Sequence, residues 1–243
     1  MARKVYGGVR TESYKVLEYL ESTGTQYCEV DFLPTGSSDN LKIECDVQYT
    51  DTSLSAQAIV GRYFTSPTQK YEFGITDTRY FYNIGGGNGS ALISPDTNRH
   101  TLIVDGIKFY VDNQAFSTNN VTTFSDTTIK PYIFARNNNG GGATWNAKAK
   151  LYSAKFYWND VLSLDLVPAK RISDNVLGLF DKVTKKFYTN KGTGTFTAGS
   201  ETSEIINVDV AKNVSKIYAG VSGVAKKVVK GYVGVGNVAK PFF

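Results

Sequence analysis

The chain has 243 residues, of which 23 are glycine, 16 tyrosine and 14 phenylalanine. Many short strands joined by glycine-rich turns give this composition, and a helical bundle does not. No run of about 18 apolar residues occurs, so we expect no membrane insertion. No apolar segment follows the basic start at residues 1–4, so the sequence predicts no export signal.

Residues 14–21 are the one passage with some helical character, since Val16, Leu17 and Leu20 could share a helix face. The passage is short, lacks a capping residue and runs into a Ser-Thr-Gly turn. We therefore predict a strand there.

Period-two alternation dominates the body of the chain and predicts half-buried strands. In residues 41–49 every odd position is apolar or aromatic and every even one is polar. Asp105-Gly106 lies between two apolar runs, which is typical of a hairpin turn, and Asp112-Asn113 turns the chain again. The expected core-facing residues are Cys28, Val30, Ile43, Cys45, Val47, Leu102, Val104 and Phe109. Further strands are expected at 71–76, 79–84, 131–136, 149–158, 161–167, 176–180 and 185–189.

A 14-residue repeat marks the end of the chain. Val-Ala-Lys recurs at residues 210–212, 224–226 and 238–240, and in step with it residues 218–221 match residues 232–235. Each unit has the length of a small β-hairpin and is too short to bury a core. It must therefore stack on its neighbours or on other chains.

Residues 2–9 carry a partial copy of the repeat, so we divide the chain into an arm (1–13), a sandwich (14–200) and a repeat tail for assembly or anchoring (201–243). Six lysines and no acid follow from Val210 onwards, which suits an acidic partner. Unpaired strand edges invite pairing with another chain, so arm and tail are expected to make the contacts of a homo-oligomer. The residues expected in these contacts are Tyr6, Val9, Tyr218, Val221, Lys226, Lys227, Tyr232, Val235, Phe242 and Phe243.

Three segments, at residues 14–27, 133–140 and 178–196, together resemble concanavalin-A-like or laminin-G-like jelly-roll modules in phage and prophage proteins from gut Firmicutes. The resemblance spans residues 14–199, and the tail repeats resemble segments of phage structural proteins. It implies an all-β fold, a two-sheet antiparallel jelly-roll sandwich with a short β-rich N-terminal arm and the C-terminal repeat tail. It also implies a place in the virion, but no particular ligand.

Glycosidases of this fold carry the carboxylate pattern Glu-x-Asp-x-x-Glu along one strand. Residues 29–31 and 44–46 begin that pattern, but Pro34 and Tyr49 occupy the third position. Both cysteines fall at apolar positions and are expected to be reduced core thiols, so His100, the one histidine, has no nucleophile to activate. We expect no enzyme.

Sugar binding needs an exposed aromatic ring with amide, carboxylate or guanidinium groups beside it. Two places meet that demand: the glycine-rich loop before Trp145, and a tyrosine-rich strand beside a second glycine-rich turn. The alternative is that Trp145 packs on the sandwich rim and that the tyrosines belong to the core. The candidate glycan-binding residues are Trp145, Arg136, Asn137, Asn138, Asn139, Tyr80 and Tyr82.

We expect a phage virion protein that displays a non-catalytic sandwich for attachment to a host-surface glycan, with other virion proteins and further copies of itself as partners. The alternatives are a purely architectural capsid-decoration, head-fibre or tail component and, less favoured, a glycoside hydrolase. Nucleic acid is not an expected partner, because the body is near neutral. No cofactor is expected; calcium at the loop residues Asp105, Asp112 and Asp126 is the alternative.

Overall fold

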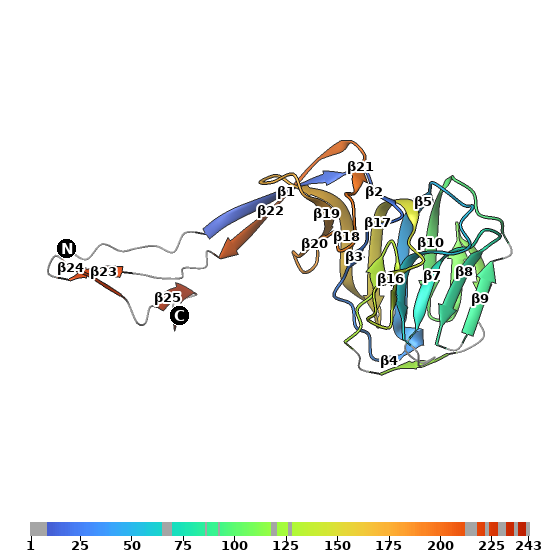
Figure 1. Ribbon diagram of the computed structural model, residues 1–243. Helices are drawn as coiled ribbons and strands as arrows, with labels where there is room; N and C mark the ends of the chain where they lie inside the picture. Colours follow the sequence, from blue (N-terminus) through green and yellow to red (C-terminus); the bar gives the residue numbers. More distant parts are fainter. Residues whose placement is uncertain are drawn as a thin grey trace. The chain divides into compact units, whose positions relative to one another are not determined.

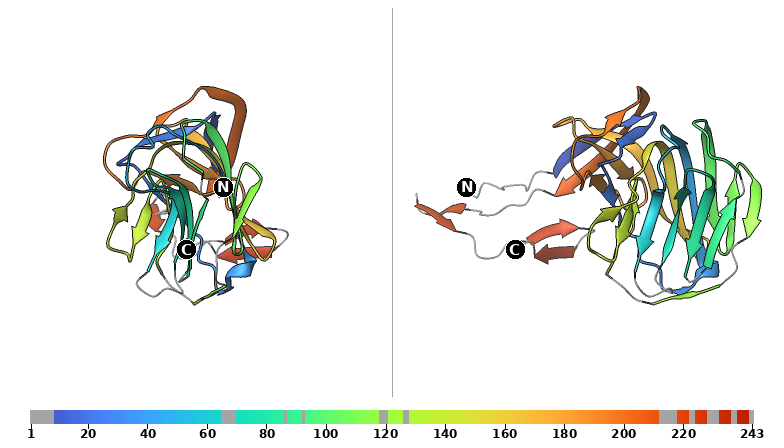
Figure 2. Two further views of the ribbon diagram at one scale, coloured as in Figure 1. Left: turned by 90° about the vertical axis from the view of Figure 1, so that its right-hand side faces the viewer. Right: turned by 45° about the vertical axis from the view of Figure 1, so that its right-hand side comes forward.

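The computed structural model describes residues 9–64, 70–85, 87–91, 93–117, 121–125, 128–211, 218–221, 224–227, 232–235 and 238–241. Within these residues two mainly antiparallel sheets pack face to face as a sandwich (Figures 1 and 2). The one helical element described is a short 3₁₀ turn, η1 (Ser38–Asn40), and no described helix has the length and apolar character to cross a membrane. The predicted all-β sandwich class is confirmed.

The larger sheet contains the longest strands of the chain. Its main path runs β12-β11-β10-β5-β17-β18-β1-β22, and β19, β20, β2 and β21 pair beside that path. Within residues 14–21, β1 covers residues up to Leu17 and β2 starts at Leu20, which confirms strand rather than helix there. The strands of this sheet are β1 (Val9–Leu17), β2 (Leu20–Thr23), β5 (Leu41–Tyr49), β10 (Arg99–Asp105), β11 (Lys108–Val111), β12 (Gln114–Ser117), β17 (Lys148–Trp158), β18 (Val161–Arg171), β19 (Leu177–Asp181), β20 (Phe187–Thr189), β21 (Thr197–Ala198) and β22 (Glu201–Ala211).

The smaller sheet runs β16-β15-β6-β7-β8-β9, with β14 paired to both β3 and β6. Its pairs are antiparallel except for β15 and β6, which run parallel. A separate two-stranded pair joins β4 (Gly36–Ser37) to β13 (Thr123–Phe124). The strands of the smaller sheet are β3 (Cys28–Glu29), β6 (Gln57–Tyr63), β7 (Tyr71–Ile75), β8 (Tyr80–Ile84), β9 (Gly87–Ala91), β14 (Tyr132–Ile133), β15 (Arg136–Asn138) and β16 (Ala143–Thr144).

The core lies between the two sheets and follows the alternation of the sequence. Strand β5 buries every odd residue from Leu41 to Tyr49. Rings from opposite sheets meet there, since the centroid of Phe109 lies 6.3 Å from that of Phe73 and 5.9 Å from that of Tyr82. All eight predicted core-facing residues are at most 1% exposed, which confirms them. Both cysteines are buried free thiols, and burial raises the pKa of each.

Both predicted hairpin turns are present, one at the predicted residues and one shifted along the chain. Asp112 and Asn113 both have positive φ, 48° and 69°, between β11 and β12. The other turn is shifted by one residue, because Asp105 still pairs with Lys108. The turn therefore begins at Gly106, whose φ of 56° suits a residue without a side chain.

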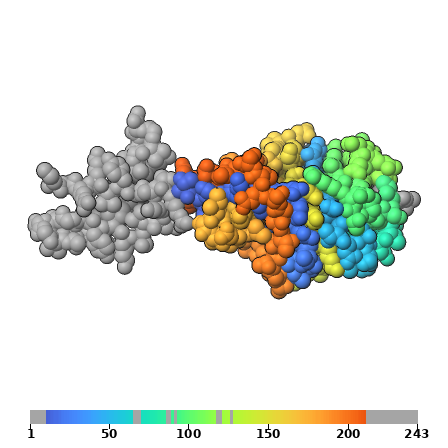
Figure 3. Space-filling view, turned by 90° about the horizontal axis from the view of Figure 1, so that it is seen from above, coloured from blue at the N-terminus to red at the C-terminus, as the bar shows by residue number. Residues whose placement is uncertain are grey.

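The chain divides into two compact units. One is the sandwich, Ser13–Ile206, and the other contains the described residues of Met1–Glu12 and Asn207–Phe243. Strands β1 and β22 are neighbours in the larger sheet, and Figure 3 shows their blue and orange-red residues side by side. The N-terminal and C-terminal segments therefore meet through strand pairing.

Two of the tail repeats form hairpins with the same register. Strand β23 (Tyr218–Val221) pairs with β24 (Val224–Lys227), and β25 (Tyr232–Val235) pairs with β26 (Val238–Pro241). Val221 faces Val224 in the first hairpin as Val235 faces Val238 in the second, so one repeat unit corresponds to one hairpin in these copies. Of the predicted assembly residues, Tyr6, Phe242 and Phe243 lie outside the described residues. Val9, Tyr218, Val221, Lys226, Lys227, Tyr232 and Val235 belong to strands β1, β23, β24 and β25.

Candidate functional site

Strand β8 corrects one half of the predicted sugar site. Tyr80 and Tyr82 are 1% and 0% exposed, and the Tyr82 hydroxyl donates a hydrogen bond to the carbonyl oxygen of Gly106 at 2.8 Å. Rings so deep in the core cannot meet a sugar, so the prediction of these two residues as glycan-binding is wrong. Because successive residues of a strand face opposite ways, Phe81 and Asn83 lie on the outward face instead.

This outward face borders a hollow of about 270 Å³. Trp145, which directly follows β16, lines it together with Phe81, and the two rings meet edge to face with centroids 5.6 Å apart. The hollow therefore has one partly exposed ring, Trp145, a second ring, Phe81, that is only 6% exposed, and a rim able to form hydrogen bonds. Its other lining residues are Thr76, Arg79, Asn83, Gly89 and Ser90.

Gly74 on β7 allows the backbone of β6 to approach closely. It pairs with Phe81 across β7 and β8, and directly opposed residues in an antiparallel pair share a face. A Cβ atom at Gly74 would meet the carbonyl oxygen of Gln57 at 2.0 Å. A side chain there would force β6 and β7 apart, so the close pairing of these strands depends on glycine.

Arg136 supports Trp145 rather than lining the hollow. Its guanidinium carbon lies 3.7 Å from the centroid of the Trp145 ring and 4.8 Å from that of Tyr63. Its Nε donates to Oγ1 of Thr144 at 3.0 Å, and its Nη1 lies 3.6 Å from Oε2 of Glu72. The structure thus brings the predicted Arg136 and Trp145 together, with the arginine packed against the indole.

Glu72 is a buried carboxyl group that the sequence reasoning missed. It is 1% exposed, and its Oε1 accepts a hydrogen bond from Nδ2 of Asn83 at 3.0 Å, which orients an amide that lines the hollow. Burial raises the pKa of Glu72, against the opposing effects of the Asn83 hydrogen bond and the Arg136 charge. A carboxyl with a raised pKa suits acid–base chemistry. Glycoside hydrolysis needs a second carboxyl, however, and no acidic residue is among the described residues that line the hollow.

Of the three predicted asparagines, Asn137 and Asn138 end β15, and Asn139 begins the turn to β16. Asn137 is 3% exposed, its Nδ2 donates to the carbonyl oxygen of Lys130 at 2.8 Å, and its Oδ1 accepts from the backbone amide of Gly140 at 3.0 Å. With both ends of its amide engaged in the loop, Asn137 is wrong as a predicted sugar ligand. Asn138 and Asn139 do not line the hollow either, and Asn139 has the positive φ of a turn residue, 56°.

The acid pairs rejected as catalytic form surface ion pairs. Both oxygens of Asp46 accept from Arg99, at 2.6 Å from Nε and 2.5 Å from Nη2. Glu44 pairs with Lys42 at 2.8 Å, and Asp31 lies 2.7 Å from Nζ of Lys130. Each of these carboxylates already has a cationic partner.

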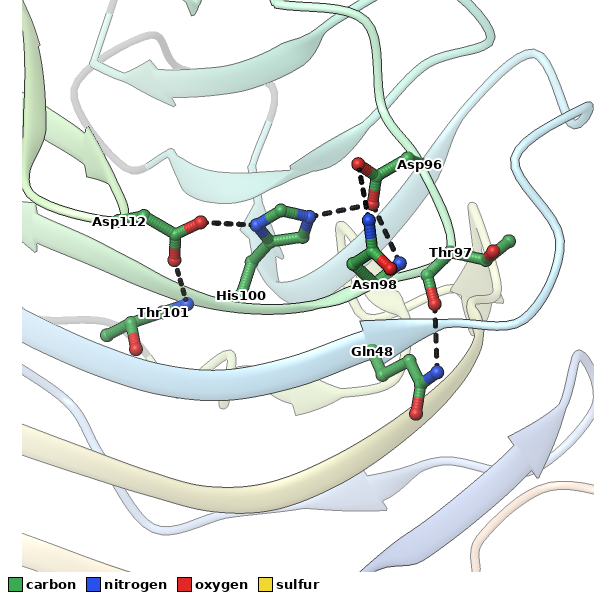
Figure 4. Close-up of polar contacts among 7 residues, drawn as sticks. All are labelled: Gln48, Asp96, Thr97, Asn98, His100, Thr101 and Asp112. Atoms are coloured by element: carbon green, nitrogen blue, oxygen red, sulfur yellow. Dashed lines mark hydrogen bonds and ion pairs between the residues drawn. The ribbon is translucent and has the colours of Figure 1, made fainter.

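His100 lies between two carboxylates on the larger sheet (Figure 4). Its Nδ1 is 2.5 Å from Oδ2 of Asp112, and its Nε2 is 2.8 Å from Oδ1 of Asp96. Asp112 also accepts from the backbone amide of Thr101 at 2.8 Å. Burial lowers the pKa of His100, but the hydrogen bonds to the two carboxylates outweigh it, so the pKa is raised overall. Through these two contacts His100 connects Asp96, in the loop before β10, with Asp112, in the turn after β11.

The calcium alternative finds no support in the described part of the chain. No group of three or more histidine, cysteine, aspartate or glutamate side chains there is arranged to hold a metal ion. Asp112 is engaged by His100, and Asp126 lies outside the described residues.

A second hollow, of about 550 Å³, lies between the turn after β18 and the loop after β20. Its aromatic lining residue, Phe196, is only 4% exposed. Its guanidinium, from Arg171, is held by Asp174, with Nε 2.9 Å from Oδ1 and Nη2 2.7 Å from Oδ2. This hollow therefore lacks a partly exposed ring such as Trp145 in the first hollow.

The candidate site is thus the hollow beside Trp145, on the outward face of the smaller sheet. The alternation of β8 is the signal that could have found Phe81 and Asn83, once Tyr80 and Tyr82 are assigned to the core. The chain matches no protein-family model and no curated protein.

Proposed function

We propose that this protein binds carbohydrate, without altering it chemically, in the hollow beside Trp145 and Phe81. The observation that carries the proposal is the meeting of these two rings with hydrogen-bonding side chains around one hollow of about 270 Å³. The faces of aromatic rings suit the C–H groups of a sugar. Amide, hydroxyl and guanidinium groups at the rim suit its hydroxyls, and a few placed polar groups fix a ligand's orientation.

The biological setting proposed is the virion of a phage, in which the sandwich attaches the particle to a glycan on the host surface. The resemblance of residues 14–199 to phage jelly-roll modules supports this setting. The architectural alternative, a capsid or tail component without a ligand, predicts an empty hollow. A measurement of carbohydrate binding therefore distinguishes the attachment proposal from the architectural alternative.

The arm and tail are proposed to join the protein to other copies of itself or to other virion proteins. The support is the pair of hairpins with one register, because an isolated two-stranded hairpin is marginally stable in water. A chain cut to Ser13–Ile206 should stay folded and run as a monomer in light scattering, whereas the full chain should associate. Equal association of the two would refute the proposed role of the ends.

A glycan array tests the proposed binding. The wild-type chain should bind a defined subset of glycans, and Trp145→Ala should weaken that binding by about tenfold or more, because the sugar loses one ring of its platform. Trp158→Phe is the matched control, since Trp158 packs against the core near Phe124 and should leave binding unchanged. Array binding that survives Trp145→Ala would move the site elsewhere, and an array without any bound glycan would favour the architectural alternative.

A further inference from the structure

The described lining of the hollow carries charge of one sign. Among the described residues that line it, Arg79 carries the one formal charge, and the others are aromatic, hydroxyl, amide or glycine residues. Glu72 lies behind Asn83, is buried, and has its own cation in Arg136 at 3.6 Å. The formal charge of the described lining residues is therefore positive.

The backbone of Arg79 is fixed while its guanidinium is available. Its amide donates to Oγ1 of Thr76 at 3.2 Å, and its carbonyl oxygen accepts from the amide of Thr76 at 2.8 Å, so the turn between β7 and β8 holds the residue in place. Arg79 is exposed, and within the described residues its guanidinium has no hydrogen-bond or ion-pair partner.

Other arginines of the sandwich differ from Arg79. Arg99 is bonded by Asp46, Arg171 by Asp174, and Arg136 stacks on Trp145. An arginine that borders a hollow without an internal partner can offer a charge-assisted, two-pronged hydrogen bond to a planar or tetrahedral anion.

We propose, on the basis of the carbohydrate-binding function above, that the ligand is an anionic saccharide whose carboxylate or phosphate group binds Arg79. Arg79 directly precedes β8 and Asn83 lies within it, four residues further on, which at ~3.3 Å per residue separates them by about 13 Å. That length exceeds a single pyranose ring. The anionic group would bind at the Arg79 end, a ring would lie against Trp145 and Phe81, and hydroxyl groups would reach the Asn83 end.

Titration with three probes, glucose, glucuronate and glucose 6-phosphate, tests the proposal by NMR. Trp145 and Trp158 are the two tryptophans of the chain, so the indole N–H signal of Trp145 reports on the hollow and that of Trp158 serves as an internal reference. We expect at least one acidic probe to shift the Trp145 signal at about tenfold lower concentration than glucose, as one charge-assisted contact allows. Glucuronate and glucose 6-phosphate together show whether the favoured anion is a carboxylate or a phosphate.

Variants at Arg79 test whether its guanidinium causes the preference for acidic probes. Arg79→Gln should abolish the preference for acidic probes and leave the response to glucose, and Arg79→Lys should retain part of it. Lys108→Gln, which removes the same charge from an exposed position on β11, should behave as wild type. Equal responses to neutral and acidic probes, or a preference that survives Arg79→Gln, would overturn the anion proposal while leaving carbohydrate binding intact. If no probe shifts Trp145 and the array also remains empty, the proposed function itself falls.

Discussion

The outward faces of the two sheets obey the same alternation and differ in chemistry. On the larger sheet the polar groups satisfy one another: Arg99 is bonded to Asp46 and stacks on Tyr152 at 3.6 Å, and the Tyr152 hydroxyl donates to Gln48 at 2.9 Å. On the smaller sheet polar side chains border the hollow beside Trp145. Alternation thus predicts two solvent-facing surfaces, and the contacts that the polar groups make on each surface decide which of them can bind a ligand.

The largest loss of stability should come from a substitution at Gly74 on the smaller sheet, where β6 and β7 approach closely. Gly74→Ala should lower the free energy of unfolding by about 2 kcal/mol or more, because the new Cβ would meet the Gln57 carbonyl oxygen. Urea denaturation measures the loss. Gly141→Ala is the control, since its nearest contact, the carbonyl oxygen of Asn138, is 3.2 Å away in an exposed loop, and its change should stay below about 0.5 kcal/mol. Equal stability of the two variants would contradict the account of β6 and β7.

A smaller effect should separate the two faces of β8. Tyr82→Phe removes the hydroxyl that bonds to Gly106 and should lower the free energy of unfolding by about 1 kcal/mol without altering glycan binding. Phe81→Leu keeps most of the volume, should cost less than about 1.5 kcal/mol, and should weaken glycan binding. Denaturation and array measurements on both variants check this, and a Tyr82→Phe chain that loses binding would reverse the assignment of faces.

The smallest effect concerns the larger sheet and depends on pH. The pKa of His100 is raised, so its ion pairs stabilise the fold below the ordinary value of 6.5 and are lost as pH rises through the folded value. The pKa values of Asp96 and Asp112 are lowered, so the same contribution is lost again as pH falls through their folded values below 3.8. The difference in unfolding free energy between wild type and His100→Gln should therefore be largest between the two ordinary pKa values, 3.8 and 6.5. It should reach about 1 kcal/mol at most, because both carboxylates are half exposed.

Unfolding measured from pH 3 to pH 9 checks this pH dependence. Glycan binding by His100→Gln should match wild type, because His100 does not line the hollow. A stability difference that stays flat with pH would show that the two ion pairs do not form as described.

The sequence predicts the fold better than the site, for a physical reason. Strand alternation at Leu41–Tyr49 and the left-handed turn at Asp112 are local properties, and local pattern suffices to predict both. A strand such as β8, aromatic on both faces, shows by alternation which residues share a face but not which face is buried. Which face of β8 is turned to the core depends on the opposing sheet, whose Phe109 packs on Tyr82.

The other missed features are likewise contacts between distant segments. Glu72 becomes a buried carboxyl only because Arg136, 64 positions along the chain, reaches it through the parallel pairing of β15 and β6. The sequence pattern predicted the three asparagines as sugar ligands. The side-chain amide of Asn137, however, forms hydrogen bonds to the backbone of Lys130 and Gly140. Trp145 was singled out because a ring beside a glycine-rich loop is a local signal; the structure places it at the hollow, and its role in sugar binding stays a prediction.

The most direct test of the central claim is a crystal structure of the chain with the saccharide that binds most strongly on the array. The account predicts a sugar ring against Trp145 and Phe81, with hydroxyl groups bonded to Asn83 or Ser90 and an anionic group at Arg79. A saccharide bound in the second hollow beside Phe196, or on the outward face of the larger sheet, would contradict it.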